Sequence, residues 1–182
     1  MSIKYIWATV AFVIIFIMLF ANKKVRIFSV FIEQLQVFKN AKTNKLSPWD
    51  FVCFIFMPIG LATVITFGFQ VIIDDELAGI LTTVFSLVFT ILFGFAAILI
   101  GKIDSKNCVE KQVVGETFIS IVSATLLSLI SAVLSIIIIK INNALILSIL
   151  SLIVFAVSFM TVMLLLLIIK RTFIVYSNSR DK

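Results

Sequence analysis

The residues of this chain that could take part in chemistry are few, and they lie in short polar segments. Asp74, Asp75 and Glu76 form an acidic triplet that could attract a cation. The triplet is too short to wrap an ion and lacks the ligand spacing of a calcium-binding loop. We therefore expect no metal site, and we expect Asp75 and Glu76 to cap the helix that follows them.

Nucleophiles and bases are equally scarce. The chain has no histidine, and its two cysteines, Cys53 and Cys108, are far apart and belong to no CxxC pair. A zinc site or a disulfide framework is therefore not expected. Every Asp and Glu lies outside the long apolar segments, so no general-base constellation can be assembled. We predict a non-enzymatic protein without a catalytic residue or a cofactor.

Small and hydroxylated residues form the more regular pattern. They recur at steps of three and four residues along two apolar segments, so each set lies on one side of a helix. We call these sets the first and second seams. The first seam consists of Gly79, Thr83, Ser86, Thr90, Gly94, Ala97 and Gly101, and the second consists of Ser120, Ala124, Ser128, Ser131 and Ser135.

The composition indicates the solvent in which these helices fold. Hydrophobic residues make up 62% of the 182 residues, charged residues 13%, and the mean hydropathy is +1.25. A soluble domain of this size has too much surface to hide so many apolar side chains. The net charge of +6 fits basic residues beside membrane spans. No basic stretch is interleaved with exposed aromatics, so direct nucleic-acid binding is not expected.

The fold class is therefore an all-α polytopic membrane protein with a single membrane domain. About 20 apolar residues cross a hydrocarbon core of about 30 Å. Five segments are long enough or nearly so, and they are Tyr5–Ala21, Phe51–Ile73, Leu77–Ile100, Thr117–Ile139 and Ala144–Ile169. The second contains Pro58 and Gly60, where we expect a kink. The first lacks a small residue at the position that a signal-peptide cleavage site requires, so we expect it to stay as a span.

The basic residues predict the orientation of the spans. With the N-terminus outside and the C-terminus inside, all of the 15 Lys and Arg residues except Lys4 and Lys140 fall on the inner side. The last four spans then form two hairpins, with short outer turns at Asp74–Glu76 and Lys140–Asn143. Trp49, at the start of the second span, is expected to anchor it at the membrane interface.

The segment Asn22–Asp50 contains a further helical pattern. Its apolar residues fall on one helix face, and its polar residues avoid that face. The apolar set is Val25, Phe28, Ile32, Leu35 and Phe38, and the polar set is Lys24, Glu33, Gln34, Gln36 and Lys39. Two interpretations are open: an amphipathic helix on the cytoplasmic surface of the membrane, or an extension of the first span that packs on other subunits.

Two interpretations of the seams are also open. Small residues let helices approach closely, and hydroxyls can bond across the contact, so the seams could serve packing within the chain. Alternatively, rings of Ser and Thr from several copies could line a path through an oligomer. Gln70, near the outer end of its span, could face such a path or cap a helix contact.

One part of the chain resembles known proteins. The residues concerned are Lys45, Ser47, Pro48, Trp49, Asp50, Pro58, Asp75, Leu77 and the run Leu81-Thr82-Thr83-Val84-Phe85-Ser86. This stretch resembles a loose group of uncharacterised bacterial multi-span proteins found near phage-defence genes, and the chain is similar in size and span number to the small membrane subunit of the Kiwa system. The resemblance covers about Lys45 to Ile100 and carries no functional residue. It implies a bacterial inner membrane and an oligomer that works with a cytoplasmic protein partner.

These observations predict a non-enzymatic, multi-pass inner-membrane protein whose partners are the lipid bilayer, further copies of itself and a cytoplasmic protein. Its role would be that of an oligomeric membrane anchor, a sensor or a pore-forming component, within a phage-defence system. The alternative is a transport protein, either a channel or the permease component of a larger complex, for a small solute.

Overall fold

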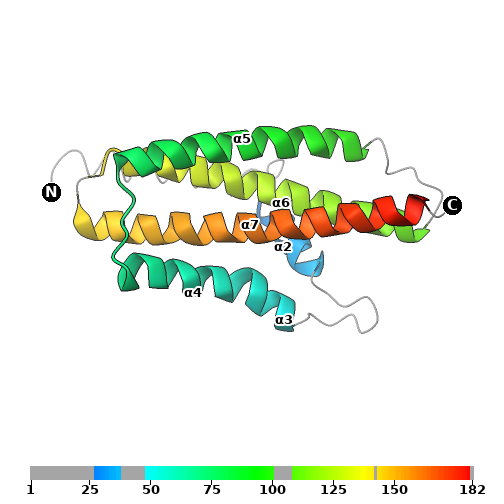
Figure 1. Ribbon diagram of the computed structural model, residues 1–182, viewed down its shortest axis with the longest axis horizontal. Coiled ribbons are helices and arrows are strands. Elements are labelled where there is room, and N and C mark those ends of the chain that lie inside the picture. The colour runs from blue at the N-terminus through cyan, green and yellow to red at the C-terminus, as the bar shows by residue number, and fades with distance from the viewer. Residues whose placement is uncertain (1–26, 38–47, 101–107, 142, 181–182) are drawn as a thin grey trace.

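The computed structural model of the protein describes residues 27–37, 48–100, 108–141 and 143–180 (Figure 1). Within these ranges every regular element is a helix and no strand occurs. Four helices are long and apolar enough to cross a membrane: Pro48–Gly68, Asp75–Ile100, Lys111–Ile138 and Ala144–Ile174. The predicted all-α, multi-span architecture is thereby confirmed. The fifth predicted span, Tyr5–Ala21, lies outside the described residues.

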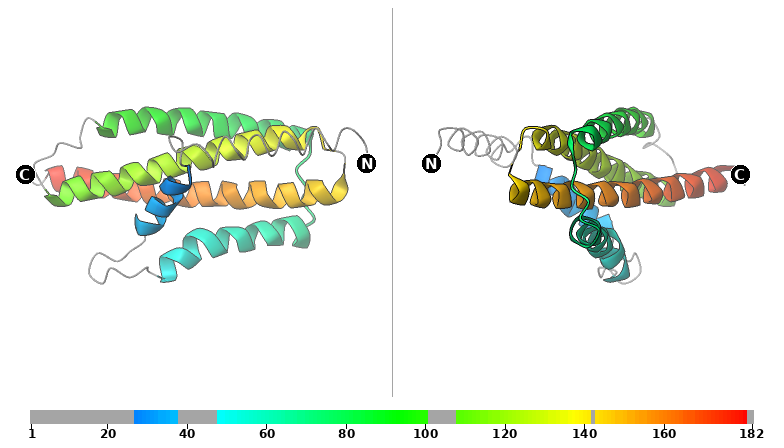
Figure 2. Two further views of the ribbon diagram at one scale, coloured as in Figure 1. Left: turned by 180° about the vertical axis from the view of Figure 1, so that it is seen from behind. Right: turned by 60° about the vertical axis from the view of Figure 1, so that its left-hand side comes forward.

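The helices form an elongated bundle in which α6 and α7 each contact several neighbours. In chain order the elements are α2 (Ile27–Val37), α3 (Pro48–Phe51), the π-helical turn η1 (Val52–Phe56), α4 (Met57–Thr63), the π-helical turn η2 (Val64–Gly68), α5 (Asp75–Ile100), α6 (Cys108–Ile138) and α7 (Ala144–Arg180). Helix α6 packs against both α5 and α7, and α2 lies against α6 (Figures 1 and 2). Helix α4 packs against α7.

The two predicted hairpins differ in how their helices pack. Helices α6 and α7 lie side by side, but α4 and α5 do not touch each other. The chain leaves η2 as an irregular segment, residues 69–74, and crosses the end of α7 before α5 begins (Figure 1). Two spans that are consecutive in the sequence are therefore separated in space by α7.

The span that contains Pro58 adapts its helical pitch to the proline. Proline has no N–H to donate, and its ring excludes the carbonyl four residues earlier. The π-helical turn η1 ends immediately before this region, and the N–H of Met57 donates to the carbonyl of Val52, five residues back. The disturbance predicted at Pro58 and Gly60 thus takes the form of a widened helical turn.

The same span ends at Gly68 rather than at the predicted Ile73. Gln70 adopts a φ of 56°, in the left-handed region, which a right-handed helix cannot accommodate. The next helix begins with a cap from Asp74, whose Oδ1 accepts a hydrogen bond of 2.8 Å from the N–H of Leu77. The prediction that Asp75 and Glu76 form this cap is wrong; they occupy the first turn, where their charges favour the helix dipole.

The buried residues of α5 are regularly spaced and lie on the side of the helix that faces the bundle. Its buried residues are Ala78, Phe85, Leu92 and Leu99, at intervals of seven. Such a repeat keeps one face of a helix against its neighbour. Leu92 and Leu99 pack with Ile121 of α6 in one apolar cluster, and Ala78 packs with Ile138 in a second cluster.

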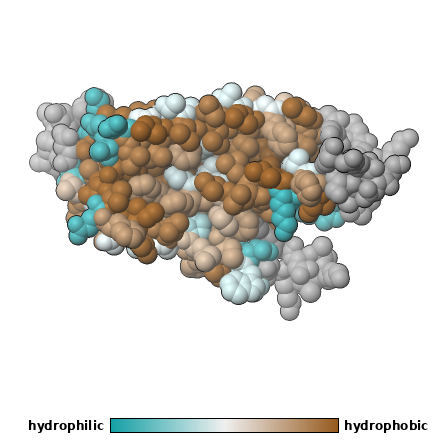
Figure 3. Space-filling model, in the orientation of Figure 1, coloured by the Kyte–Doolittle hydropathy of each residue, from teal (hydrophilic) through white to brown (hydrophobic). Residues whose placement is uncertain are grey.

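The face of the bundle in Figure 3 is mostly apolar along its length, with hydrophilic patches toward its ends. Among the exposed large side chains are Phe56, Leu87, Phe93, Leu166 and Ile169. A soluble monomer rarely exposes apolar surface on this scale, whereas lipid accepts it. The surface therefore agrees with the span composition in indicating a membrane protein.

Candidate functional site

The second seam lies inside the bundle. Ser120, Ala124, Ser128, Ser131 and Ser135 have no exposed surface at all. All five project from α6, the helix that α5 and α7 flank (Figure 2). This is the position that the packing interpretation of the seam requires, since a hydroxyl-lined path would leave these side chains open to a channel.

Hydrogen bonding divides the hydroxyls of α6 into two groups. Ser120 donates to the carbonyl of Glu116 at 3.0 Å, and Ser128 donates to that of Thr125 at 2.8 Å. The hydroxyls of Ser123, Ser131 and Ser135 are buried without any hydrogen-bond partner. A buried polar group without a partner costs about 1–3 kcal/mol. These three side chains therefore have unused hydrogen-bonding capacity in the interior.

An ion pair joins α6 to α7 at one end of the second seam. Arg171 Nη2 lies 3.3 Å from Glu116 Oε2, with side-chain exposures of 16% and 33% respectively. Arg171 Nη1 also donates to Ser120 Oγ at 3.4 Å, and the Gln112 amide donates to Glu116 Oε1 at 3.0 Å. These polar side chains fix the relative position of the two helices.

Sequence reasoning missed this cluster because Glu116 and Arg171 each fall just beyond a predicted span. A signal was nevertheless present. Gln112, Glu116 and Ser120 continue the second seam at steps of four, which places them on one helix face. The cluster offers no evident catalysis: the Ser120 hydroxyl donates to a backbone carbonyl, so no base activates it as a nucleophile.

The first seam has the opposite environment. Gly79, Thr83, Ser86, Thr90 and Gly94 are exposed on α5, as is Ala97. Gly101 lies outside the described residues. The seam is displaced by roughly 145° around the helix from the buried stripe that includes Ala78 and Phe85. The buried stripe therefore holds the contact with α6, and the seam points away from it.

The exposed hydroxyls of the first seam are satisfied within their own helix. Thr83 donates to the carbonyl of Gly79 at 3.0 Å, and Thr90 donates to that of Ser86 at 2.9 Å. Ser86 bonds its helix in the same way. A Cβ atom added at Gly79 or Gly94 would meet nothing within 4 Å. The described part of the chain therefore leaves this groove-like face open.

The other predicted positions are dispersed. Trp49 is 75% exposed at the start of α3, which suits an indole at a membrane interface. Gln70 is exposed in the crossing segment, and Cys53 is a half-buried free thiol. No group of three or more Cys, Asp or Glu side chains that could hold a metal ion is found among the described residues. Asp75 and Glu76 line a shallow depression beside Gly79.

Comparison with known protein families, with curated proteins and with solved structures finds no match to this chain.

Proposed function

We propose that this protein is a non-enzymatic, self-associating component of a bacterial inner membrane, and that it acts as an anchor, a sensor or a pore-forming subunit. The observation that carries the proposal is the contrast between the two seams. The second is enclosed within the bundle, whereas the first, on α5, is exposed and has no neighbour in the described part of the chain.

The first seam has the chemistry of a helix contact in lipid. Two helices in lipid gain no hydrophobic free energy when their apolar side chains contact each other, because lipid is equally apolar. Close backbone approach between small residues therefore decides which faces meet. Gly79 and Thr83 are four residues apart, as are Thr90 and Gly94, and each pair forms a small-xxx-small motif. A second copy that packs its own α5 against this face would bring the two sets of motifs together.

Substitution of the glycines tests self-association. Gly79→Leu introduces a bulky side chain into the seam, and Gly60→Leu is the matched control because Gly60 is also exposed with nothing within 4 Å of an added Cβ. We expect Gly79→Leu to shift the protein from oligomer to monomer in native mass spectrometry from mild detergent, and Gly60→Leu to leave the oligomer intact. A strictly monomeric wild-type chain, or an oligomer that survives Gly79→Leu, would contradict the proposed contact.

The proposed role in phage defence rests on the resemblance of the region Lys45 to Ile100. Bacteria that carry the gene with its neighbours should resist phage, and the Gly79→Leu variant should lose this protection if the oligomer is the working form. The proposed cytoplasmic partner should co-purify with the wild-type protein in mild detergent. Equal plaque counts with and without the gene would count against a defence role. Membrane-potential measurements would then distinguish a membrane anchor from a pore-forming subunit.

A transport function is the second candidate. The hydroxyls of Ser131 and Ser135 are enclosed without a partner, so a small neutral solute would reach them only if α6 separates from its neighbours during passage. Purified protein in liposomes should then accelerate the entry of such a solute, and Ser131→Ala should reduce the rate. Failure to accelerate the entry of polyols, urea or small amides would count against transport.

A further inference from the structure

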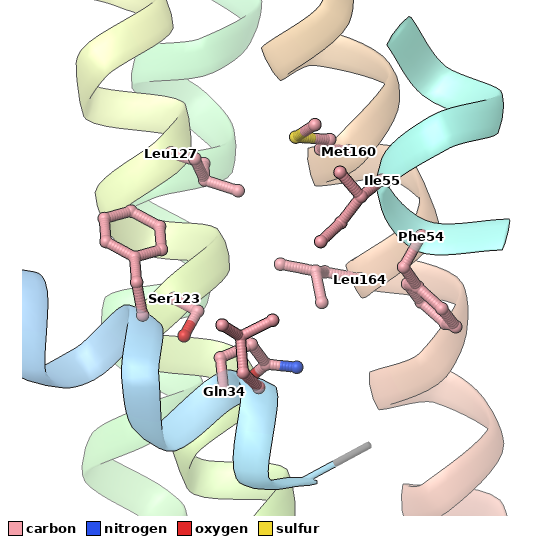
Figure 4. A pocket seen from close by; sticks show the side chains of 9 residues that line it. Gln34, Phe54, Ile55, Ser123, Leu127, Met160 and Leu164 are labelled. Carbon is pink, nitrogen blue, oxygen red and sulfur yellow. The ribbon is translucent and has the colours of Figure 1, made fainter. Parts of the chain in front are cut away.

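A cavity of about 220 Å³ lies where four elements of the bundle meet (Figure 4). Helix α2 contributes Phe31 and Gln34, η1 contributes Phe54, α6 contributes Ser123, and α7 contributes Leu164. In Figure 4, Gln34 and Ser123 come from the α2 and α6 side of the cavity, and Leu164 comes from the α7 side. The cavity is therefore apolar except at one side, where an amide and a hydroxyl lie.

Both polar side chains are buried, and neither has a hydrogen-bond partner. Gln34 is 5% exposed, and neither its Oε1 nor its Nε2 is bonded. Ser123 has no exposed surface, and its hydroxyl is likewise unbonded. Most buried polar groups in proteins find a partner, so two such groups facing one cavity indicate that something other than the described residues completes the site.

The orientation of α2 strengthens this inference. The sequence pattern assigns Gln34 to the polar face of the helix and Ile32 to its apolar face. The structure buries Gln34, however, and leaves Ile32 43% exposed, while Leu35 packs against an apolar cluster of the bundle. Lipid accepts the outward isoleucine, but a buried glutamine amide costs free energy unless it has a hydrogen-bond partner inside.

We propose that this cavity is a binding site for a small neutral amphiphile, a mainly apolar molecule with one carboxamide, protonated carboxylic acid or hydroxyl head. The head lies between Gln34 and Ser123, where the glutamine amide supplies both a donor and an acceptor. The apolar body contacts Phe31, Phe54 and Leu164. The described residues that line the cavity include no charged side chain, so among them an ionised ligand would lose its hydration without compensation.

The volume limits the size of the ligand. A cavity of about 150 Å³ binds benzene, so the enclosed part of this cavity accommodates about nine non-hydrogen atoms. A substituted benzene ring fits within it, and because the cavity is partly open, a longer amphiphile would extend out of it. The site does not depend on the proposed contact through α5, because no residue of α5 lines the cavity. Binding and self-association can thus fail separately.

Fluorine NMR on the full-length protein in phosphatidylcholine nanodiscs tests the site. The probe is 4-fluorobenzamide, with 4-fluorotoluene as its apolar analogue and 4-fluorobenzoate as its ionised analogue, and empty nanodiscs supply the reference for partition into lipid. We expect saturable broadening of the amide signal, and about tenfold weaker binding of the toluene, as loss of one to two net hydrogen bonds implies. The benzoate should not bind above the reference.

Variants separate the polar head site from the cavity itself. Gln34→Leu should weaken amide binding about tenfold and preserve toluene binding, whereas Gln36→Leu, an exposed position on the same helix, should change neither. Leu127→Trp fills the cavity and should abolish binding of both probes. The proposal is overturned if no probe binds above empty nanodiscs, if the amide and toluene bind equally, which would leave only buried water on the polar groups, or if the benzoate binds as tightly as the amide.

Discussion

The backbone N–H of Ile73 donates a hydrogen bond of 3.1 Å to the Oγ of Ser151, and both residues are fully buried. This bond attaches the irregular segment 69–74 to α7. An irregular backbone near the apolar part of a membrane protein needs such partners, because lipid offers none. The Ser151 hydroxyl thereby attaches the segment that connects α4 and α5 to a third helix, α7.

Replacement of this serine should loosen the crossing. Ser151→Ala leaves the Ile73 N–H buried without a partner, and we expect a loss of about 1–3 kcal/mol in the free energy of unfolding. Ser148→Ala is the control, because the Ser148 hydroxyl bonds only the carbonyl of Ala144 in its own helix; its effect should stay within about 0.5 kcal/mol. Reversible unfolding in mixed detergent measures both. Equal effects would show that the bond to Ile73 contributes nothing.

The pair of Glu116 and Arg171 should contribute modestly to stability. We expect a double-mutant cycle of Glu116→Gln and Arg171→Gln to give a coupling free energy of about 0.5–1 kcal/mol at low salt, because both side chains retain some exposure. The coupling should shrink as salt rises, since ions screen a partly exposed pair. A coupling near zero at low salt would mean that Ser120 and Gln112 alone position these side chains.

Gln70 offers a site at which a substitution should stabilise the protein. Its φ of 56° is unfavourable for a residue with a Cβ. Gln70→Gly relieves this cost but increases the freedom of the unfolded chain, and we expect a net gain of about 0.5–1 kcal/mol. Gln70→Ala keeps the Cβ and should give no such gain. Thermal unfolding in one detergent compares the three proteins, and a glycine variant that melts below the alanine variant would contradict the argument.

The two groups of hydroxyls on α6 should respond differently to alanine. Ser131→Ala removes a buried group that has no partner, so stability should stay unchanged or rise by up to about 1 kcal/mol. Ser120→Ala removes a hydroxyl that contacts both Glu116 and Arg171, and stability should fall by about 1 kcal/mol. Measurement of the free energy of unfolding of each variant, compared with that of the wild-type protein, tests both expectations. A large loss for Ser131→Ala would reveal a bound partner for that hydroxyl.

Conduction is tested by membrane potential during expression. If copies assemble into a pore, cells that express the wild-type protein should depolarise, as a voltage-sensitive dye reports, and cells that express Gly79→Leu at the same level should not. Gly79 is preferable to Ser128 for this purpose, because Ser128 is fully enclosed and a leucine there would overpack the interior by about 1–3 kcal/mol. If the membrane potential stays steady in cells that express the wild-type protein, with and without phage, the result would favour a role as an anchor or a sensor.

The sequence predicts the spans well because length and hydropathy alone define them. It does not decide which face of a helix is turned inward. On α5 a stripe with a repeat of seven, which includes Phe85 and Leu92, and a seam of small residues are both regular, and only the fit against α6 selects the first. On α2 the predicted polar face does not hold at Gln34, which lies on the inner side of the helix, whereas Ile32 of the predicted apolar face is exposed.

The contacts between spans could not be predicted either. Neighbours in sequence are usually neighbours in space, which makes a hairpin of α4 and α5 the natural expectation. The bond between Ile73 and Ser151 shows why it fails: the segment after η2 lies across α7 instead of turning back. The ion pair of Glu116 and Arg171 also joins residues that are far apart in the sequence. The second seam, extended by steps of four, indicates Glu116 but gives no sign of Arg171.

The separation of α4 from α5 has a consequence for how the protein is made. Helix α4 leaves the ribosome early, but its packing partner α7 begins only at Ala144, after α5 and α6 have been synthesised. The contact of α4 with α7 can therefore form only late in synthesis, although Pro58 and Ala62 of α4 are buried in the finished bundle. Interruption of synthesis before Ala144 would leave α4 without the helix against which it packs.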